Sequence, residues 1–591
     1  MSAVPGITQR ILDGGLGIPA TTPDLLHCKV GVCSGGIRNK PRLVTDVAAL
    51  VAQYRAGPLV DSAAHHIDRT GSVWIVRTNT STNGTIGAVT KIPAGVATGA
   101  LTATFSTYTL HASIPAGGPL SVLTGWVKLP IPGKVTISLA APGVATVYTL
   151  TGKGLEGELQ TETISLGVAP SSNTSLGEYT EIISLTTPGD PMGATTVTKV
   201  EATPVDAYEV IVEIMKAGSV AGVSFTYRYS LDLGRTFSPT LSAPAGGVVD
   251  IQSYAPGSDL PFLGFKITFT DGGGPAFFLL GDKFTFETTA PTWTLSDVLT
   301  GMDAIALDTT TRSSFSGYHL VGPADGTIYS SVEAQLSTYA DKKFLYRWAY
   351  LESVRQGATL EATWAAAVVT SFATTGVRTG VVAMDMDIFS PALRTFNRRN
   401  MTTSYIARLM ACPISELPSH VDCETVFGTK TALEGVTRLY QGDASVETLT
   451  LANIVTARTY TTRTGFYITR SVLKTLDTSD YRDITNRRVM DVAATVGYDA
   501  TLSFLQSTQL ANPATGRLAD DAATNIAATV KGKLNVPLQG GQRRHVSDLD
   551  VQVSTANPFL QDRTIFETIK IVPRGAVDFI QNTYSFTPSL T

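Results

Sequence analysis

The stretch KVGVCSGGIRNKP, Lys29 to Pro41, decides how the start of this chain is interpreted. It contains G-V-C-S-G, a form of the turn that presents a catalytic serine or cysteine at the end of a strand. Such a turn requires a helix immediately after the nucleophile, because the helix N-terminus helps to stabilise an oxyanion. Cys33 is instead followed by a loop that contains Pro41. We therefore expect a buried strand that ends in a glycine-rich loop, and a cysteine hydrolase using Cys33 is a remote alternative.

The residues around this stretch predict the beginning of an α/β unit. Residues 28–33 are apolar enough for a strand, and SVWIVRT, residues 72–78, predicts a second buried strand. Between them Thr45 or Asp46 can cap a helix, and a second short helix is expected to end before Gly71. Two strands and two short helices cannot close a core. This unit is therefore expected to complete its sheet with a distant part of the chain.

The middle of the chain, from about residue 80 to 291, is rich in Gly, Thr, Ser and Pro, and its apolar residues recur with a period of two. The clearest runs are Val135, Ile137 and Leu139; Val210, Val212 and Ile214; Val223, Phe225, Tyr227 and Tyr229; Phe265, Ile267 and Phe269; and Phe284 and Phe286. This alternation is typical of antiparallel strands with one face in water. We expect two inserted β-sandwich domains, residues 91–204 and 205–292.

Helical and strand patterns alternate in residues 293–450, as in an α/β layered domain. Ser330 and Glu333 fit a capping box at the start of a helix. Further helices are expected from about residue 486 to 509 and from about residue 520. The predicted fold class is α/β or α+β, with a core built from the N- and C-terminal parts of the chain and all-β sandwich-like domains inserted.

The composition limits what the protein can be. A chain of 591 residues is too long for one core, and its 16% of charged residues lies well below the usual share of about 25%. Forty-five basic and forty-nine acidic residues give a net charge of −4, which disfavours nucleic acid and anionic membranes as main partners. The sequence shows no signal peptide and no apolar run of roughly 20 residues. We expect a soluble cytosolic chain whose charge-poor surface is covered by copies of itself.

No group of residues in the sequence predicts a catalytic, metal or cofactor site. His65 and His66 are adjacent in an expected helix and point about 100° apart, which is unsuitable for shared metal binding. His27 with Cys28 and Cys33 lacks the paired spacing of a zinc site.

The N-terminal residues resemble the opening of the contractile tail sheath proteins of bacteriophages. In that family a strand leads to a G-x-x-x-G-x-x-N-x-P loop, two helices and a strand that reads V-x-x-V-R. The matching positions in this sequence are Gly31, Gly35, Asn39, Pro41 and Val73 to Arg77.

A separate block near the C-terminus resembles the same family. There the sheath domain has a strand that reads G-x-Y-[IV]-x-R, a loop, and a helix that begins N-R-R-V-x-D. The matching positions are Gly465, Tyr467, Arg470, Asn486, Arg487, Arg488, Val489 and Asp491. With similar β segments between the two blocks, the matches cover the larger part of the chain in the family's order. The large double insertion and the cysteines depart from the family pattern.

The resemblance implies a structural protein without enzymatic activity, metal or cofactor. It implies a virion protein, made late in the host cytoplasm, that forms hexameric rings stacked helically around a tail tube. Contraction would drive the tube through the host envelope for genome ejection. The implied partners are copies of the chain, the tail tube protein, and baseplate and tail terminator proteins, with no direct nucleic-acid contact and no membrane insertion. The sheath of a phage-derived bacterial injection particle is the nearest alternative.

The resemblance also implies a role for each part of the chain. Residues 1–25 and 575–591 would be arms that add strands to sheets of neighbouring subunits. Residues 26–90 would begin the core, the β insertions would lie outermost, and residues 451–574 would face the tube.

The four cysteines leave two alternatives open. If residues 28–33 form one strand, Cys28 and Cys33 point to opposite faces and lie roughly 16 Å apart, beyond the limit of about 7 Å for a disulfide. A bond would need Cys412 or Cys423, in this subunit or in a neighbour. Because phage particles leave a reducing cytosol for an oxidising medium, an intersubunit disulfide is one expectation, and ordinary buried thiols are the other.

Overall fold

The computed structural model describes the chain between residues 26 and 575, with gaps. The described ranges are 26–95, 97–106, 109–114, 120–139, 145–155, 157–168, 170–187, 195–199, 203–252, 262–273, 277–311, 314–357, 359–421, 443–461, 463–540 and 544–575. The expected arms therefore lie outside the described residues, apart from residue 575. The mixed α/β content with several small sheets confirms the predicted class at that level.

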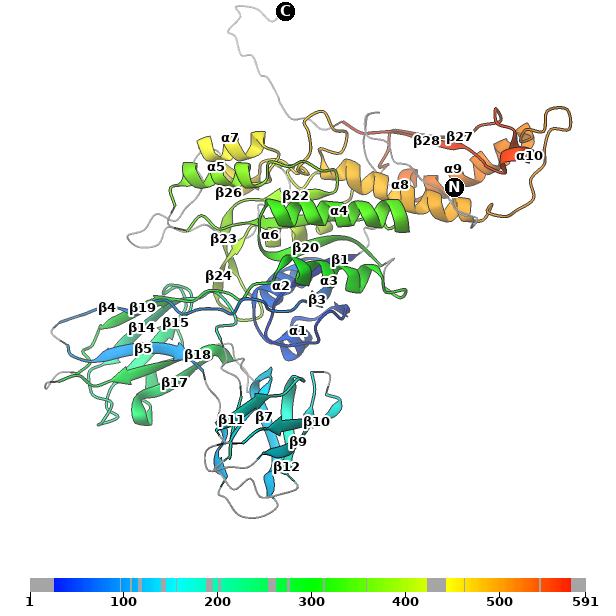
Figure 1. Ribbon diagram of the computed structural model, residues 1–591. Helices are drawn as coiled ribbons and strands as arrows, with labels where there is room; N and C mark the ends of the chain where they lie inside the picture. The colour runs from blue at the N-terminus through cyan, green and yellow to red at the C-terminus, as the bar shows by residue number, and fades with distance from the viewer. Residues whose placement is uncertain are drawn as a thin grey trace, which may run out of the picture.

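A six-stranded sheet, in the order β2-β3-β1-β20-β21-β22, lies at the centre of the described chain (Figure 1). All neighbours are parallel except β2 and β3. The strands are β1 (Leu26–Gly31), β2 (Arg42–Val44), β3 (Val73–Arg77), β20 (Phe315–Ala324), β21 (Trp348–Ser353) and β22 (Thr379–Val382). Because β1 pairs with β3 on one side and β20 on the other, the expected completion of the N-terminal unit by a distant part of the chain is confirmed.

Helices cover both faces of this sheet, as in a three-layer α/β arrangement. On one face α2 packs against α1 and α6, and on the other α3 and α4 pack together, with α5 and α7 joined to the same apolar cluster. Their bounds are α1 (Val47–Tyr54), α2 (Pro58–Thr70), α3 (Leu295–Ala306), α4 (Gly326–Lys343), α5 (Glu361–Ser371), α6 (Thr402–Ala411) and α7 (Asp443–Leu451). Side chains alternate along a strand, so Cys28 and Val30 join the cluster around α3, whereas Lys29 contacts α2.

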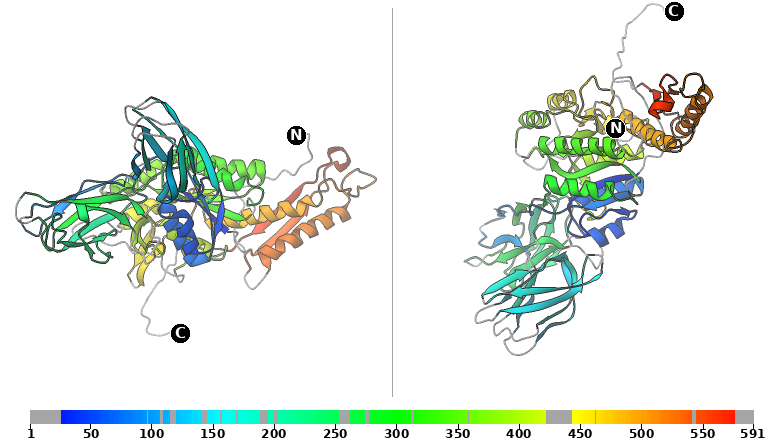
Figure 2. Two further views of the ribbon diagram at one scale, coloured as in Figure 1. Left: turned by 90° about the horizontal axis from the view of Figure 1, so that it is seen from below. Right: turned by 45° about the vertical axis from the view of Figure 1, so that its right-hand side comes forward.

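Two all-β modules lie at one end of the molecule (Figure 2). Module I has two four-stranded sheets, formed by β6 (Thr109–Ile114), β7 (Leu120–Gly133), β8 (Val135–Leu139), β9 (Thr146–Lys153), β10 (Leu159–Leu166), β11 (Ser171–Thr174), β12 (Tyr179–Thr187) and β13 (Thr195–Lys199). Module II has a five-stranded and a three-stranded sheet, formed by β4 (Thr90–Ile92), β5 (Ala100–Phe105), β14 (Glu209–Lys216), β15 (Thr226–Ser230), β16 (Leu241–Ser242), β17 (Val248–Gln252), β18 (Phe262–Thr270) and β19 (Lys283–Glu287). The period-two pattern thus predicts strands correctly in both modules.

Two details of the β region differ from the expectation. Residues 90–105, placed by sequence in the first insertion, contribute β4 and β5 to module II, where they pair with β19 and β18. Val223, expected inside with Phe225 and Tyr227, is 50% exposed and has a positive φ of 45°. It lies in the turn before β15, so the alternation begins only at Phe225.

A third unit projects from the opposite end of the core (Figure 1). This C-terminal module consists of α8 (Ile484–Leu502), α9 (Asp520–Gln539), the short α10 (Phe559–Asp562) and a hairpin of β27 (Asp548–Val553) and β28 (Glu567–Val572). Helices α8 and α9 pack together, and β27 packs on α9. The buried residues Ile526, Val530 and Leu534 lie on one face of α9, as helical spacing requires.

The expected capping box at Ser330 and Glu333 is wrong. Helix α4 begins one turn earlier, because the Asp325 side chain accepts hydrogen bonds from two backbone N–H groups of the first turn at 3.0 and 2.9 Å. Ser330 lies inside the helix and donates to the carbonyl of Gly326. Glu333 instead accepts a bond from the N–H of Val377, which leads into β22. None of the described helices has the length and apolar character needed to cross a membrane.

Candidate functional site

The first motif residues shape the loop that leaves β1. A Cβ atom at Gly35 would lie 2.7 Å from the carbonyl oxygen of Gln53, and one at Gly31 would lie 3.0 Å from the side chain of Val321. Both distances are too short for a larger residue, so close packing of backbone requires glycine here. Pro41 directly precedes β2. These positions therefore serve the geometry of the core, consistent with the interpretation of the stretch as a strand and loop.

Arg77, at the end of β3, connects this loop to module I. Its guanidinium donates to the carbonyl of Gly36 and forms an ion pair with Glu178 at 3.4 Å. Arg38 forms a second ion pair with Glu178. Asn39 adopts a left-handed φ of 54° and donates its N–H to the carbonyl of Arg77 at 2.7 Å. The motif thus holds two arginines at the contact between the core and module I.

The second motif lies at the start of α8 and joins this helix to the central sheet. Asp491 accepts hydrogen bonds from Arg487 at 2.5 Å and from Arg378 at 3.1 Å, and all three side chains are buried. The Arg487 guanidinium also lies 4.2 Å from the ring centre of Tyr481. Because Arg378 immediately precedes β22, this cluster fixes the C-terminal module to the core.

Arg488 lies at the other side of the same helical turn. It donates to the carbonyls of Leu409 at 3.1 Å and Cys412 at 3.5 Å, at the end of α6. Burial lowers its pKa to about 9, and a cation at a helix C-terminus is favoured by the helix dipole. Asn486 donates to the carbonyl of Asp480 at 2.6 Å, which shapes the turn before α8.

The remaining motif residues belong to the hairpin of β25 (Ala457–Tyr460) and β26 (Arg463–Ile468). Gly465 has a φ of 95°, a conformation that favours glycine. The Tyr467 ring packs against Tyr460 with ring centres 5.3 Å apart, and Arg470 follows the strand, partly exposed. The structure therefore places the two motif blocks in separate joints and does not bring them together in one site.

A buried polar cluster crosses three strands of the sheet and was not predicted from the sequence. Lys29 on β1 donates to the Ser62 hydroxyl on α2 at 2.9 Å and lies 2.9 Å from His319 Nδ1 on β20. His319 Nε2 is 2.8 Å from the Glu352 carboxylate on β21. The order Ser62, His319, Glu352 is similar to a hydrolase triad. Ser62 and His319 are 0% exposed, however, so a substrate cannot reach the hydroxyl.

Burial sets the charge of this cluster. It lowers the pKa of Lys29 to about 7, with the carboxylate of Glu352 opposing the shift. Burial likewise raises the pKa of Glu352 to about 7. It lowers the pKa of His65 to about 4 and holds the pKa of His27, His66 and His319 well below 6.5, with Lys29 adding to the effect. The four histidines are therefore neutral at pH 7. Among the described residues no group of His, Cys, Asp and Glu is arranged to hold a metal ion.

Module II is held to the core by a hairpin of β23 (Asp385–Phe389) and β24 (Phe396–Asn400). Arg399 on β24 donates to Asp61 on α2 at 2.5 Å and to Asp206, just before β14, at 2.8 Å. All three groups are buried. Although burial lowers the pKa of Arg399, the carboxylates of Asp206 and Asp61 raise it overall, so the arginine stays charged.

A second ion network lies beside the first. Asp387 on β23 accepts bonds from Arg398 at 2.8 Å and from Arg235 of module II at 2.6 Å. The hairpin thus shares charged groups with both the core and module II. We call β23 and β24 with these two networks the strut.

Two of the cysteines, Cys28 and Cys33, are free, buried thiols. Cys28 and Cys33 are 0% and 3% exposed, and burial raises the pKa of Cys33 to about 11. Cys412 is partly exposed, and Cys423 lies outside the described residues. A thiol that stays protonated and buried is a poor nucleophile, which counts against a hydrolase using Cys33. An intersubunit disulfide remains a prediction, and one at Cys28 or Cys33 would require the packing around these buried thiols to open.

The geometry defines a multidomain α/β protein whose charged residues join domains to one another. The family model "DUF2586, N-terminal domain" matches residues 4–472. The chain belongs to the DUF2586 family. A comparison with curated proteins finds no match.

Solved structures similar to this chain include three sheath proteins. The sheath tail protein Lin1278 from Listeria innocua is 7% identical, with 94% of this chain and 96% of that chain covered and a TM-score of 0.38. The sheath tail protein DSY3957 from Desulfitobacterium hafniense is 11% identical, with 96% and 100% covered and a TM-score of 0.39. The sheath complex of an extracellular contractile injection system, PVC, in the contracted state is 14% identical, with 46% and 71% covered and a TM-score of 0.31. All three are named as sheath proteins, the class that the sequence resemblance indicates.

The neutral histidines predict that the core loses stability in acid. The unfolded chain binds protons on these histidines below about pH 6.5, whereas the folded chain does not. The free energy of unfolding should therefore fall as the pH is lowered from 6.5 towards 4.5. Glu352 opposes this in the same window, because its raised pKa makes the folded chain bind one proton more.

The variant His65→Gln should make this dependence shallower by about one proton, or about 1.4 kcal/mol per pH unit. Urea unfolding at pH 7.5, 6.5, 5.5 and 5.0 measures the slope. The unaltered chain, measured at the same pH values, is the control. Equal slopes for His65→Gln and the unaltered chain would contradict the assignment.

From the ion pairs of the strut we predict that substitution of Arg399 lowers the free energy of unfolding strongly. Arg399→Met should destabilise the protein by about 3–5 kcal/mol, because Asp61 and Asp206 would remain buried without a cation. Arg228→Met removes a partly exposed pair with Glu213 inside module II and should cost about 1 kcal/mol or less. Calorimetry should show module II unfolding separately, at lower temperature, in Arg399→Met alone. Identical unfolding profiles of the two variants would show that the strut does not hold module II.

The burial of the thiols predicts selective labelling. Iodoacetamide should modify Cys412 in the folded protein but leave Cys28 and Cys33 unmodified until urea is added, because these two are inaccessible and protonated. Mass spectrometry of peptides locates the label. A non-reducing gel of assembled particles then tests the intersubunit bond, which should involve Cys412 or Cys423 if it forms. Rapid labelling of Cys33 in the folded chain would refute the assigned burial.

Proposed function

We propose that this chain is the structural subunit of a contractile phage tail sheath, which polymerises around a tail tube and contracts to drive the tube through the host envelope. The observation that carries this proposal is the hairpin of β27 and β28. It forms a two-stranded sheet with no further strand among the described residues on either edge. A two-stranded sheet is marginal by itself, and open edges accept strands from other chains.

The position of the hairpin supports assembly from copies of the chain. Helix α9 covers one face of the hairpin, and the module that carries it projects away from the core. In the proposed sheath the chain ends, about residues 1–25 and 575–591, add strands to this hairpin in neighbouring subunits. Contacts between different surfaces of successive copies do not close on themselves, and they generate a helical polymer.

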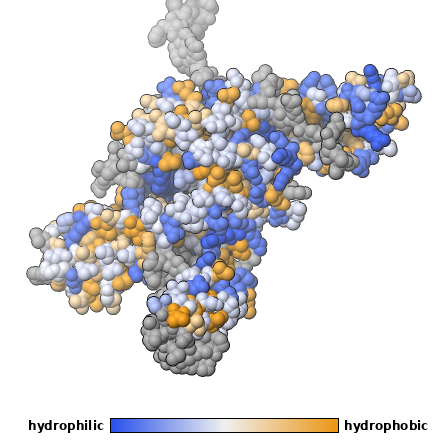
Figure 3. Space-filling model, in the orientation of Figure 1, coloured by the Kyte–Doolittle hydropathy of each residue, from blue (hydrophilic) through white to orange (hydrophobic). Residues whose placement is uncertain are grey.

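The surface of the C-terminal module also supports a contact role. Large apolar side chains that are exposed on and beside the module are Leu502 (39%), Leu510 (73%), Val536 (77%), Leu560 (62%), Phe566 (51%) and Val572 (50%). Figure 3 shows hydrophobic and hydrophilic residues mixed over the visible face of this module. Such a surface suits neighbouring subunits and the tail tube, which we propose this module faces, with the β modules outermost.

The proposed protein is not an enzyme, and its further partners are the baseplate and tail terminator proteins. The motif residues fit this function as joints: Arg77 between the core and module I, and Asp491 between the core and the C-terminal module. Rigid joints allow a subunit to move as a whole while its arms stay attached. The sheath of a bacterial injection particle requires the same mechanics and is the second candidate.

Deletion of residues 578–591 tests the proposal. The truncated chain should remain folded but fail to form tubes, because the hairpin of each neighbour would lack its added strand. Electron microscopy of the expressed protein should show striated tubes for the full chain and dispersed particles for the truncated one. A matching melting curve serves as the control for folding. Normal tubes from the truncated chain would refute the role of this arm, and dispersed monomers from the full chain would count against a sheath.

A further inference from the structure

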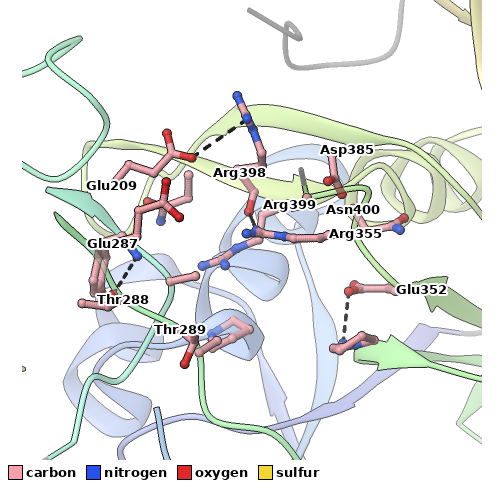
Figure 4. A pocket seen from close by; sticks show the side chains of 18 of the residues that line it. Glu209, Glu287, Thr288, Thr289, Glu352, Arg355, Asp385, Arg398, Arg399 and Asn400 are labelled. Carbon is pink, nitrogen blue, oxygen red and sulfur yellow. Dashed lines mark hydrogen bonds and ion pairs between the residues drawn. The ribbon is translucent and has the colours of Figure 1, made fainter. Parts of the chain in front are cut away.

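A cavity of about 430 Å³ lies between the central sheet, module II and the strut. Its floor is formed at the carboxyl ends of β1, β20 and β21, where Val32, Gly322 and Ser353 line it. Its roof comes from module II and from β24 (Figure 4). The volume is within the range of sites for small organic ligands.

The topology places this cavity where open α/β sheets bind ligands. From β1 the chain first adds β3 on one side, and β20, β21 and β22 later extend the sheet on the other side. The order therefore reverses between β1 and β20. A crevice outside the carboxyl ends of parallel strands at such a switch point is the usual ligand position in these folds.

Three hydrogen-bond donors belong to residues that line the cavity, and two of them have no acceptor among the described residues. Arg399 Nε and the Tyr208 hydroxyl are both buried and have no hydrogen-bond partner among the described residues. The Arg355 guanidinium donates to the carbonyl of Arg398 and forms no ion pair with a described residue. Figure 4 shows Arg355 and Arg399 extending towards the middle of the space. Unpaired buried polar groups are costly, so a ligand that accepts hydrogen bonds from them would be stabilised.

The carboxylates around the cavity are already engaged. Asp387 is paired with Arg398 and Arg235 in the strut, and Asp232 accepts bonds from Thr236. Glu352 accepts a bond from the N–H of Gly322 and contacts His319. Glu287 and Asp385, on other walls, are likewise not free. The polar groups of the lining that lack a partner are therefore hydrogen-bond donors, which suit a ligand rich in hydrogen-bond acceptors.

Two indole rings give the cavity an apolar side. Trp293 donates its N–H to the carbonyl of Val321 at 2.8 Å, and Trp364 donates to that of Val354 at 2.9 Å. Since both N–H groups are satisfied elsewhere, the rings offer apolar surface to a ligand.

We propose that this cavity binds a small organic anion with an apolar body, whose carboxylate or phosphate group is held by Arg355, Arg399 and Tyr208. The bound anion would contact the core, module II and the strut together. Its binding would therefore stabilise their relative positions, since a ligand that binds the folded state raises its stability. This proposal is independent of the sheath function.

Calorimetric titration of the full chain tests it with three probes: benzoate, phenyl phosphate and, as a cation of similar shape, benzylamine. Saturable binding with a dissociation constant below about 1 mM is expected for one of the anions, and none for benzylamine. Binding of benzoate would indicate a site for a carboxylate, and binding of phenyl phosphate would indicate a site for a phosphate ester.

Three variants locate the site. Arg355→Gln should weaken binding about tenfold, because it removes the unpaired charge. Tyr208→Phe should weaken it several-fold while leaving the protein folded, since the hydroxyl has no partner to lose. Arg517→Gln, an exposed arginine in the loop between α8 and α9, is the matched control and should not change the affinity. Lack of saturable binding by either anion, binding of benzylamine, or unchanged affinity in the first two variants would overturn the proposal and leave a water-filled cavity.

Discussion

The parallel pairing of β1 with β20 is the constraint on which the rest of the described structure depends. It places Lys29 opposite His319, 290 residues later in the sequence. Parallel strands need a crossover connection, and here the connection contains both β modules as well as α3. The three-layer core, the position of the modules and the cavity at the carboxyl edge all follow from this single pairing.

Polar groups, in addition to apolar packing, specify how the parts fit together. A buried lysine is unfavourable unless it is neutralised or hydrogen-bonded, and Lys29 obtains partners from α2 and β20 only when the sheet is correctly assembled. The same reasoning applies to Arg399, whose two carboxylate partners come from different parts of the chain. Wrong arrangements would leave buried charges unpaired, so these groups select one arrangement of domains.

The sequence predicted local elements well and long-range pairing poorly. Alternating Val, Ile and Phe residues identified strands such as β14 and β19 because one face of each packs against the module core. The boundary near residue 91 was wrong because β4 and β5 pair with β19 and β18, which follow module I in the sequence. The start of α4 was misplaced because the side chain of Asp325, which precedes Ser330 in the sequence, caps the first turn. The strut was not predicted, since its charged partners come from segments far apart in the chain.

By itself the sequence determined the class of the protein, the periodicity of its strands and helices, and the glycine-rich loop after β1. It also disfavoured a nucleophile turn at Cys33, because a loop that contains Pro41 follows in place of a helix. Only the tertiary structure decided that Lys29, His319 and Glu352 form one cluster, that Arg399 joins Asp61 to Asp206, and that unpaired donors surround a cavity. The reason is physical: local periodicity reports which face of an element is buried, whereas the partner of a buried charge depends on contacts between segments far apart in the chain.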